Sequence, residues 1–91
     1  MNYDELYSAL DELASGALEG ARLVSADELG LDSRCGMVYV GEDFIATKYP
    51  WQLDYYGAFE YVDEEYILQI GPYKFYYRGD SRIDRLLNQE N

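Results

Sequence analysis

Apolar residues recur at helical spacing through the first eighteen positions of the chain. They are Tyr3, Leu6, Tyr7, Leu10, Leu13, Ala14, Ala17 and Leu18. Such a stripe, with polar residues between its members, is typical of an amphipathic helix. Asn2 can cap its start, with Glu5 three residues later as in a capping box, and Gly16 or Gly20 can end it. We therefore predict a leading helix whose opposite face is acidic.

After the helix the pattern changes from helical spacing to alternation. Positions 21–25 suggest a short strand, and Ser25 then caps one helical turn that stops at Gly30. Runs with the composition and alternation of strands follow at 34–40, 44–49, 52–62, 66–70 and 73–78. Turn signals separate several of them at Gly41-Glu42-Asp43, Asp63-Glu64-Glu65 and Gly71-Pro72.

A second helical pattern closes the chain. Ser81, with Asp84 three residues later, can start a short helix that buries Ile83, Leu86 and Leu87. The order of elements predicts an α+β fold in one domain spanning residues 1–91. Its N-terminal amphipathic helix packs on an antiparallel sheet of about four or five strands, and a short C-terminal helix follows.

Composition indicates a folded chain. Of its residues 48% are apolar and 16% are aromatic, including eleven Tyr, whereas disordered chains are poor in aromatics. Cys35 is the only cysteine, so no disulfide forms within the chain. The sequence shows neither a signal-peptide pattern nor an apolar run of membrane-spanning length. We therefore expect a cytoplasmic protein.

The residues of most catalytic and cofactor motifs are missing. The chain has no histidine, so neither a Ser-His-Asp nor a Cys-His site can be assembled from it. No Gly-rich phosphate loop occurs, and the acidic segment 27–32 has Leu29 where a calcium loop needs its second ligand. Cys35 alternates with Met37 and Tyr39 and is interpreted as a buried strand residue. We predict no catalytic residue, metal or cofactor; catalysis by a carboxylate pair remains the third alternative.

Charge is the most unusual property of the chain. Eighteen acids stand against seven bases, which gives a net charge of −11. A small domain stays soluble with a net charge of magnitude about 2–8. Many of the acids stand side by side, at Asp4-Glu5, Asp11-Glu12, Asp27-Glu28, Glu42-Asp43 and Asp63-Glu64-Glu65. The excess of one sign therefore calls for an explanation.

A solvated helix face explains the spacing of these acids but not their sign. Asp4 and Asp11 are seven residues apart, as are Glu5, Glu12 and Glu19, and this spacing follows from the apolar stripe. Eight acids lie between Asp4 and Asp32, however, with only Arg22 among them as a base. This bias favours a basic protein partner and opposes direct binding to nucleic acid or to anionic membranes. Fixed carboxylates can occupy a protein groove built for phosphates.

Tyrosines are the second signal. Adjacent pairs such as Tyr55-Tyr56 and Tyr76-Tyr77 must point to opposite faces of a strand, so several rings should be exposed. Tyr is a favoured interface anchor, and we take Tyr55 and Tyr76 as candidates. The alternative is a half-buried sheet residue with a hydrated hydroxyl. Self-association through the sheet, as a homodimer, is one form such an interface could take.

The acidic doublets together with the Tyr-rich strands resemble, in overall character, small phage-encoded inhibitors of host proteins. That class includes anti-restriction and anti-CRISPR proteins and inhibitors of gyrase or uracil-DNA glycosylase, several of which mimic DNA. The resemblance implies a non-enzymatic inhibitor that binds the basic groove of a bacterial DNA- or RNA-binding protein. The predicted contacts are Asp4, Glu5, Asp11, Glu12, Asp27, Glu28, Glu42, Asp43, Asp63, Glu64 and Glu65, with Tyr55 and Tyr76 as anchors. The alternative is an interaction module that docks through its Tyr-rich sheet, with the charge serving solubility.

Overall fold

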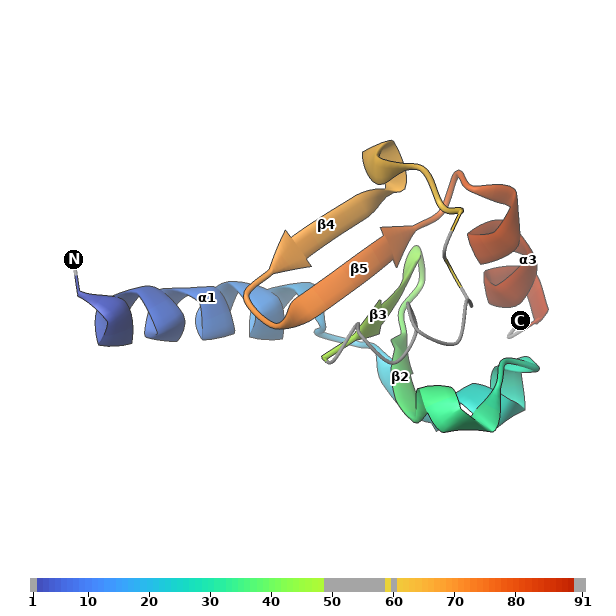
Figure 1. Ribbon diagram of the computed structural model, residues 1–91, viewed down its shortest axis with the longest axis horizontal. Coiled ribbons are helices and arrows are strands. Elements are labelled where there is room, and N and C mark those ends of the chain that lie inside the picture. The colour runs from blue at the N-terminus through green and yellow to red at the C-terminus, as the bar shows by residue number, and fades with distance from the viewer. Residues whose placement is uncertain (1, 49–58, 60, 90–91) are drawn as a thin grey trace.

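The computed structural model of the chain describes residues 2–48, 59 and 61–89, and its arrangement is shown in Figure 1. Its helices are α1 (Tyr3–Ala17) and α3 (Ser81–Gln89), with short 3₁₀ helices η1 (Ala26–Leu29), η2 (Ser33–Cys35) and η3 (Glu64–Tyr66). Its strands are β1 (Arg22–Ser25), β2 (Met37–Val40), β3 (Phe44–Thr47), β4 (Ile67–Ile70) and β5 (Tyr73–Tyr77). The predicted α+β class is confirmed.

The strands form one antiparallel sheet in the order β1-β2-β3-β5-β4. Strand β5 therefore lies between β3 and β4, so that Tyr76 faces Ile45 on one side and Ile67 on the other. Because cross-strand partners share a face of the sheet, this register places all three side chains on the same side. We call this side the core face.

The core face carries the hydrophobic core. Helix α3 packs here with Ile83, Leu86 and Leu87, as its sequence pattern predicts. The other buried members of this cluster are Val24, Ala26, Leu29, Cys35, Val38, Val40, Ile45, Phe59, Val62 and Tyr76. The core face of the sheet thus belongs to one core, to which α3, η1, η2, Phe59 and Val62 also contribute.

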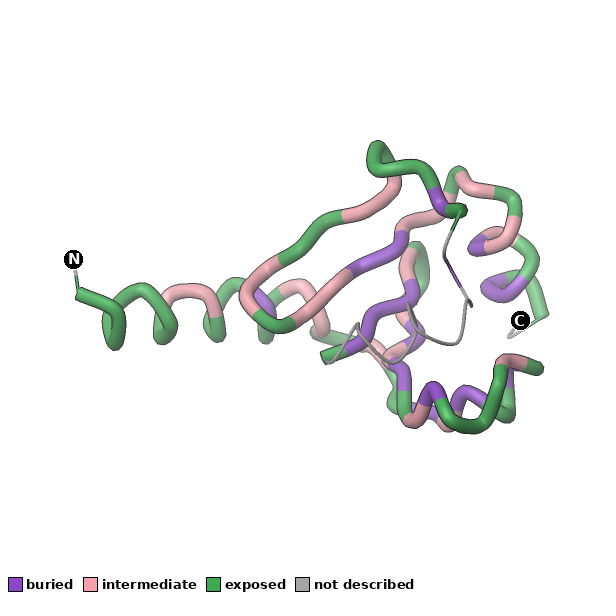
Figure 2. The backbone as a smooth tube through the Cα atoms, viewed as in Figure 1, coloured by how far each residue is buried: buried purple, intermediate pink, exposed green. Residues whose placement is uncertain are grey.

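Helix α1 meets this body only near its C-terminal end. Figure 2 shows that most of its length is exposed. Ala14 is its one buried residue, and a Cβ built on Gly71, in the β4–β5 turn, would lie 3.6 Å from Cβ of Leu10. Among the described strands, β4 makes the main contact with α1, while residues 2–8 are all exposed. We call residues 2–8 the arm.

Several predicted boundaries need correction. The strand expected at 34–40 begins only at Met37, because the Asp32 carboxylate accepts from the Arg34 N–H and starts η2, and Gly36 follows at φ 82°. The strand expected at 52–62 lies mostly outside the described residues. At its described end, Val62 donates to the Phe59 carbonyl in a turn rather than to a neighbouring strand.

Helix α3 begins at Ser81, as predicted, and the residue before it supplies the cap. The Asp80 carboxylate accepts from the Arg82 N–H at 2.8 Å, and the Asp84 carboxylate accepts from the Gly79 N–H at 2.8 Å. The cap is therefore Asp80. The capping residues predicted for α1 and η1 are confirmed, since Asn2 accepts from the Glu5 N–H and Ser25 from the Glu28 N–H.

Candidate functional site

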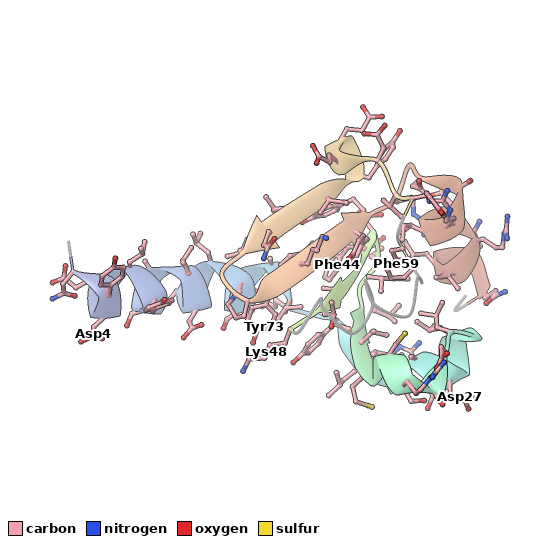
Figure 3. All side chains as sticks on the ribbon, in the orientation of Figure 1. Asp4, Asp27, Phe44, Lys48, Phe59 and Tyr73 are labelled. Carbon is pink, nitrogen blue, oxygen red and sulfur yellow. The ribbon has the colours of Figure 1, made fainter. Side chains whose placement is uncertain are left out.

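All eleven acids proposed as contacts are exposed, but they do not form one surface. They are Asp4, Glu5, Asp11, Glu12, Asp27, Glu28, Glu42, Asp43, Asp63, Glu64 and Glu65. Figure 3 places Asp4 and Asp27 toward opposite ends of the molecule, and η3 projects on a further side (Figure 1). A single flat surface cannot contact all of these clusters at once.

Some of these acids have partners within the fold. Arg78 lies 3.7 Å from the Asp43 carboxylate, donates to the Glu42 carbonyl and donates to the Asn88 side chain on α3. The Glu42-Asp43 turn therefore helps to tie the β2–β3 hairpin to α3. Asp63 caps η3 by accepting from the Glu65 N–H at 3.2 Å. The Glu42-Asp43 turn and Asp63 therefore have structural roles, and these roles could explain why acidic residues stand there.

Asp32, which lay outside the predicted contacts, has the strongest local pairing. Its carboxylate accepts from Nε and Nη2 of Arg34, at 3.0 and 2.7 Å. The side-chain and backbone hydrogen bonds from Arg34 lower the pKa of Asp32 from 3.8 to about 2. The Asp32 carboxylate is therefore paired with Arg34 of the same chain, and we do not count it among the candidate contacts.

The carboxylates of α1 differ from all of these. Within residues 2–48, 59 and 61–89, no ion pair involves Asp4, Glu5, Asp11 or Glu12. Successive residues of a helix are about 100° apart, so Asp4 and Asp11 line one margin of the apolar stripe. Glu5 and Glu12 lie on the side opposite the stripe. Asp4 and Glu5 also stand in the first turn, where negative charge favours the helix.

The same helix exposes apolar surface that an isolated protein would normally bury. Tyr3 is 77% exposed, Tyr7 59%, Leu13 61% and Leu6 41%. The rings of Tyr3 and Tyr7 stack with centroids 6.5 Å apart. These side chains continue the stripe in which Leu10 lies beside the β4–β5 turn and Ala14 is buried. The arm is thus an apolar and acidic helix end whose residues are all exposed.

The tyrosine anchors were predicted less well. Tyr55 lies outside the described residues, and the prediction for Tyr76 is wrong. The Tyr76 ring is fully buried, packed against Phe59 with centroids 4.6 Å apart, because its strand position points to the core face. It supports the core and cannot touch a partner directly.

The side of the sheet opposite the core face, which we call the outer face, is rich in aromatic rings. Phe44 packs against Phe75 and Tyr77, and Tyr39 packs against Tyr73. Phe75 at its centre is fully buried, whereas the rim is open at Leu23, Met37 and Leu68, which are 46–54% exposed. Alternation of aromatics at positions 73, 75 and 77 was the sequence signal that could have identified this face.

Among the described residues, few reactive groups are placed as a catalytic site would require. Cys35 is buried, and burial, with the negative charge of Asp32, raises the pKa of its thiol. A shallow hollow of about 370 Å³ is lined by Glu64, Ile67, Gln69 and Lys74, with a single carboxylate among them. In the described ranges no cluster of three or more His, Cys, Asp or Glu side chains could hold a metal ion. None of the helices described is both long and apolar enough to cross a bilayer.

Comparison with known proteins adds no relative. No family model matches the chain, and neither a curated protein nor a solved structure is significantly similar to it. The function must therefore be inferred from the surface chemistry of this chain alone.

Proposed function

We propose that this protein is a non-enzymatic acidic inhibitor that binds the basic nucleic-acid groove of a bacterial DNA- or RNA-binding protein. The net charge of −11 and the exposure of all eleven candidate carboxylates support a basic partner. The likeness in character to phage-encoded DNA mimics supports the choice of a nucleic-acid groove. Such a groove already carries the cations that neutralise phosphates.

The observation that carries the proposal is the set of uncompensated carboxylates on α1. The first base of the chain is Arg22, so α1 contains no cation of its own. A solvated helix face normally gains stability by alternating acids with bases at i and i+4. Helix α1 lacks that stabilisation, and it carries Asp4 far from the sheet (Figure 3).

The separation of the clusters refines how such mimicry would work. One groove would receive the carboxylates of α1, because α1 protrudes and these carboxylates have no ion-pair partner among the described residues. The clusters at η1 and η3 would then act at longer range, by adding to the negative field that steers the complex together. Asp43 would contribute least, because Arg78 already neutralises part of its charge.

Affinity capture from a bacterial lysate, eluted with a salt gradient, tests this function. The chain should retain a nucleic-acid-binding protein that added DNA displaces. The variant with Asp4→Asn, Glu5→Gln, Asp11→Asn and Glu12→Gln should release it at lower salt or fail to retain it. A matched variant with Asp27→Asn, Glu28→Gln, Glu64→Gln and Glu65→Gln should behave much more like wild type.

Two results would contradict the proposal. If both neutralised variants retain the same proteins as wild type at every salt concentration, the carboxylates do not mediate binding. If the retained protein is not displaced by DNA, the target site is not a nucleic-acid groove.

A second candidate function is favoured by the outer face of the sheet. Its exposed rim of Leu23, Met37 and Leu68 surrounds a ring cluster that could dock a partner through apolar contact. In that case the charge would serve solubility, and binding would persist at high salt. Loss of binding on Met37→Gln and Leu68→Gln, with no effect of the α1 variant, would favour this candidate over the acidic inhibitor.

A further inference from the structure

The apolar stripe of α1 is continuous, although only part of it is used inside the molecule. Leu10 lies beside the β4–β5 turn and Ala14 is buried, whereas Tyr3 and Tyr7, which continue the same spacing toward the N-terminus, are exposed. The spacings between Tyr3, Tyr7, Leu10, Ala14 and Ala17 alternate four and three residues, as in the contact seam of a coiled coil. The arm therefore presents the pattern of a helix that packs along a second surface.

Charge determines which kind of surface fits this stripe. Asp4 and Asp11 border it on one side, and the acids of α1 have no cation among the described residues. A second copy laid antiparallel on the stripe would bring the Asp4 margin of one helix near the Asp11 margin of the other. Like charges at such spacing destabilise the pair. A surface with basic margins instead gains from the same carboxylates.

We propose that the α1 arm is a docking helix that inserts Tyr3, Leu6 and Tyr7 into an apolar groove whose margin carries Lys or Arg. This inference rests on the proposed function, because both require a basic partner, and it adds that the contact is apolar as well as electrostatic. Helices that lay an apolar face into a groove commonly use anchors at i, i+3 and i+4, which is the spacing of these three residues. The stacked rings of Tyr3 and Tyr7 offer a large contact area with few rotatable bonds.

Synthetic amphipathic helical peptides of about two heptads provide the probe. One peptide has a Leu stripe with Lys margins, the second replaces Leu by Ser, and the third replaces Lys by Glu. Titration by fluorescence anisotropy should show that the full-length protein binds the Leu/Lys peptide at least about tenfold more tightly than either of the others. Binding should weaken as salt rises.

Variants locate the contact on the arm. Tyr3→Gln with Tyr7→Gln should weaken binding of the Leu/Lys peptide about tenfold or more, since truncating buried aromatic anchors has effects of this size. Gln keeps the helix propensity high, and circular dichroism would verify that α1 remains folded. The matched control is Tyr61→Gln, because Tyr61 is 76% exposed but lies outside α1; it should leave binding unchanged.

The possible failures separate the two proposals. Equal binding of the Ser/Lys and Leu/Lys peptides, unaffected by the tyrosine variants, would overturn the docking helix and leave the acidic inhibitor standing. Absence of salt-sensitive binding to either Lys peptide would count against both. Dimerisation of the wild-type chain in sedimentation experiments, abolished by the tyrosine variants, would overturn the inference by making a second copy the occupant.

Discussion

Helices α1 and α3 are both amphipathic, yet they relate to the rest of the molecule in opposite ways. Helix α3 has nine residues and buries Ile83, Leu86 and Leu87 against the core face of the sheet. Helix α1 has fifteen residues and buries only Ala14. The shorter helix is thus a structural element of the core, whereas most of the longer one faces outward.

The difference shows that an apolar stripe predicts a contact without specifying which molecule supplies it. Isolated helices of up to about 12–15 residues are marginal in water, so a helix usually depends on packing of its apolar face. Within the arm, the Asn2 cap, the acids of the first turn and the stacked rings of Tyr3 and Tyr7 support the helix. Its stripe would be expected to gain stability when a partner covers it.

The largest effect that can test this contrast comes from deleting apolar side chains. Leu87 on α3 is 2% exposed, so Leu87→Ala should lower the free energy of unfolding by about 2–5 kcal/mol through lost burial and a residual cavity. Leu13 on α1 is 61% exposed, so Leu13→Ala should change it by less than about 0.5 kcal/mol. Urea unfolding of both variants provides the measurement. Equal losses would mean that the stripe of α1 is buried in solution.

An intermediate effect comes from one glycine in α1 and one beside α3. Gly79 has φ 125°, and a Cβ there would overlap the ring of Tyr66, so Gly79→Ala should destabilise the protein by about 1–3 kcal/mol. A Cβ on Gly16 of α1 meets no atom, so Gly16→Ala should stabilise the helix by up to about 1 kcal/mol. Thermal unfolding followed by circular dichroism would compare them. A destabilising Gly16→Ala would show that the surroundings of α1 are more crowded than described.

The smallest effect separates a carboxylate paired inside the fold from the unpaired ones of α1. Carbon NMR titration of Asp32 should give a pKa of about 2, and Arg34→Gln should raise it toward 3.8, because the guanidinium stabilises the ionised form. Since the folded-state pKa is lowered, the stability contributed by this ionised carboxylate is present above pH 3.8 and is lost as pH falls toward 2. An unchanged pKa in the Arg34 variant would remove Arg34 as the cause.

Local patterns predicted much of this fold. The caps of α1 and η1, the turn at Gly41 and the burial of Ile83, Leu86 and Leu87 all follow from residues close together in sequence. The position of α1 beside the β4–β5 turn could not be predicted in this way, because it depends on where that turn lies in the folded protein. The choice between Tyr76 and Tyr77 as the buried ring required the strand register. Of the candidate site, the acids were identifiable from their sign, but the exposed Tyr3 and Tyr7 were not, because periodicity alone cannot distinguish a buried stripe from an exposed one.

The projection of α1 also makes the molecule electrically uneven along its length. The molecule measures 41 × 26 × 24 Å, with the N-terminus and α3 toward opposite ends of the long axis (Figure 1). Four acids and no bases lie on α1, whereas α3 carries Arg82 and Arg85 with the single acid Asp84. A positive surface therefore attracts α1 more strongly than it attracts α3. If the arm docks as proposed, approach with the arm first is the productive one, and this attraction raises the association rate before any contact forms.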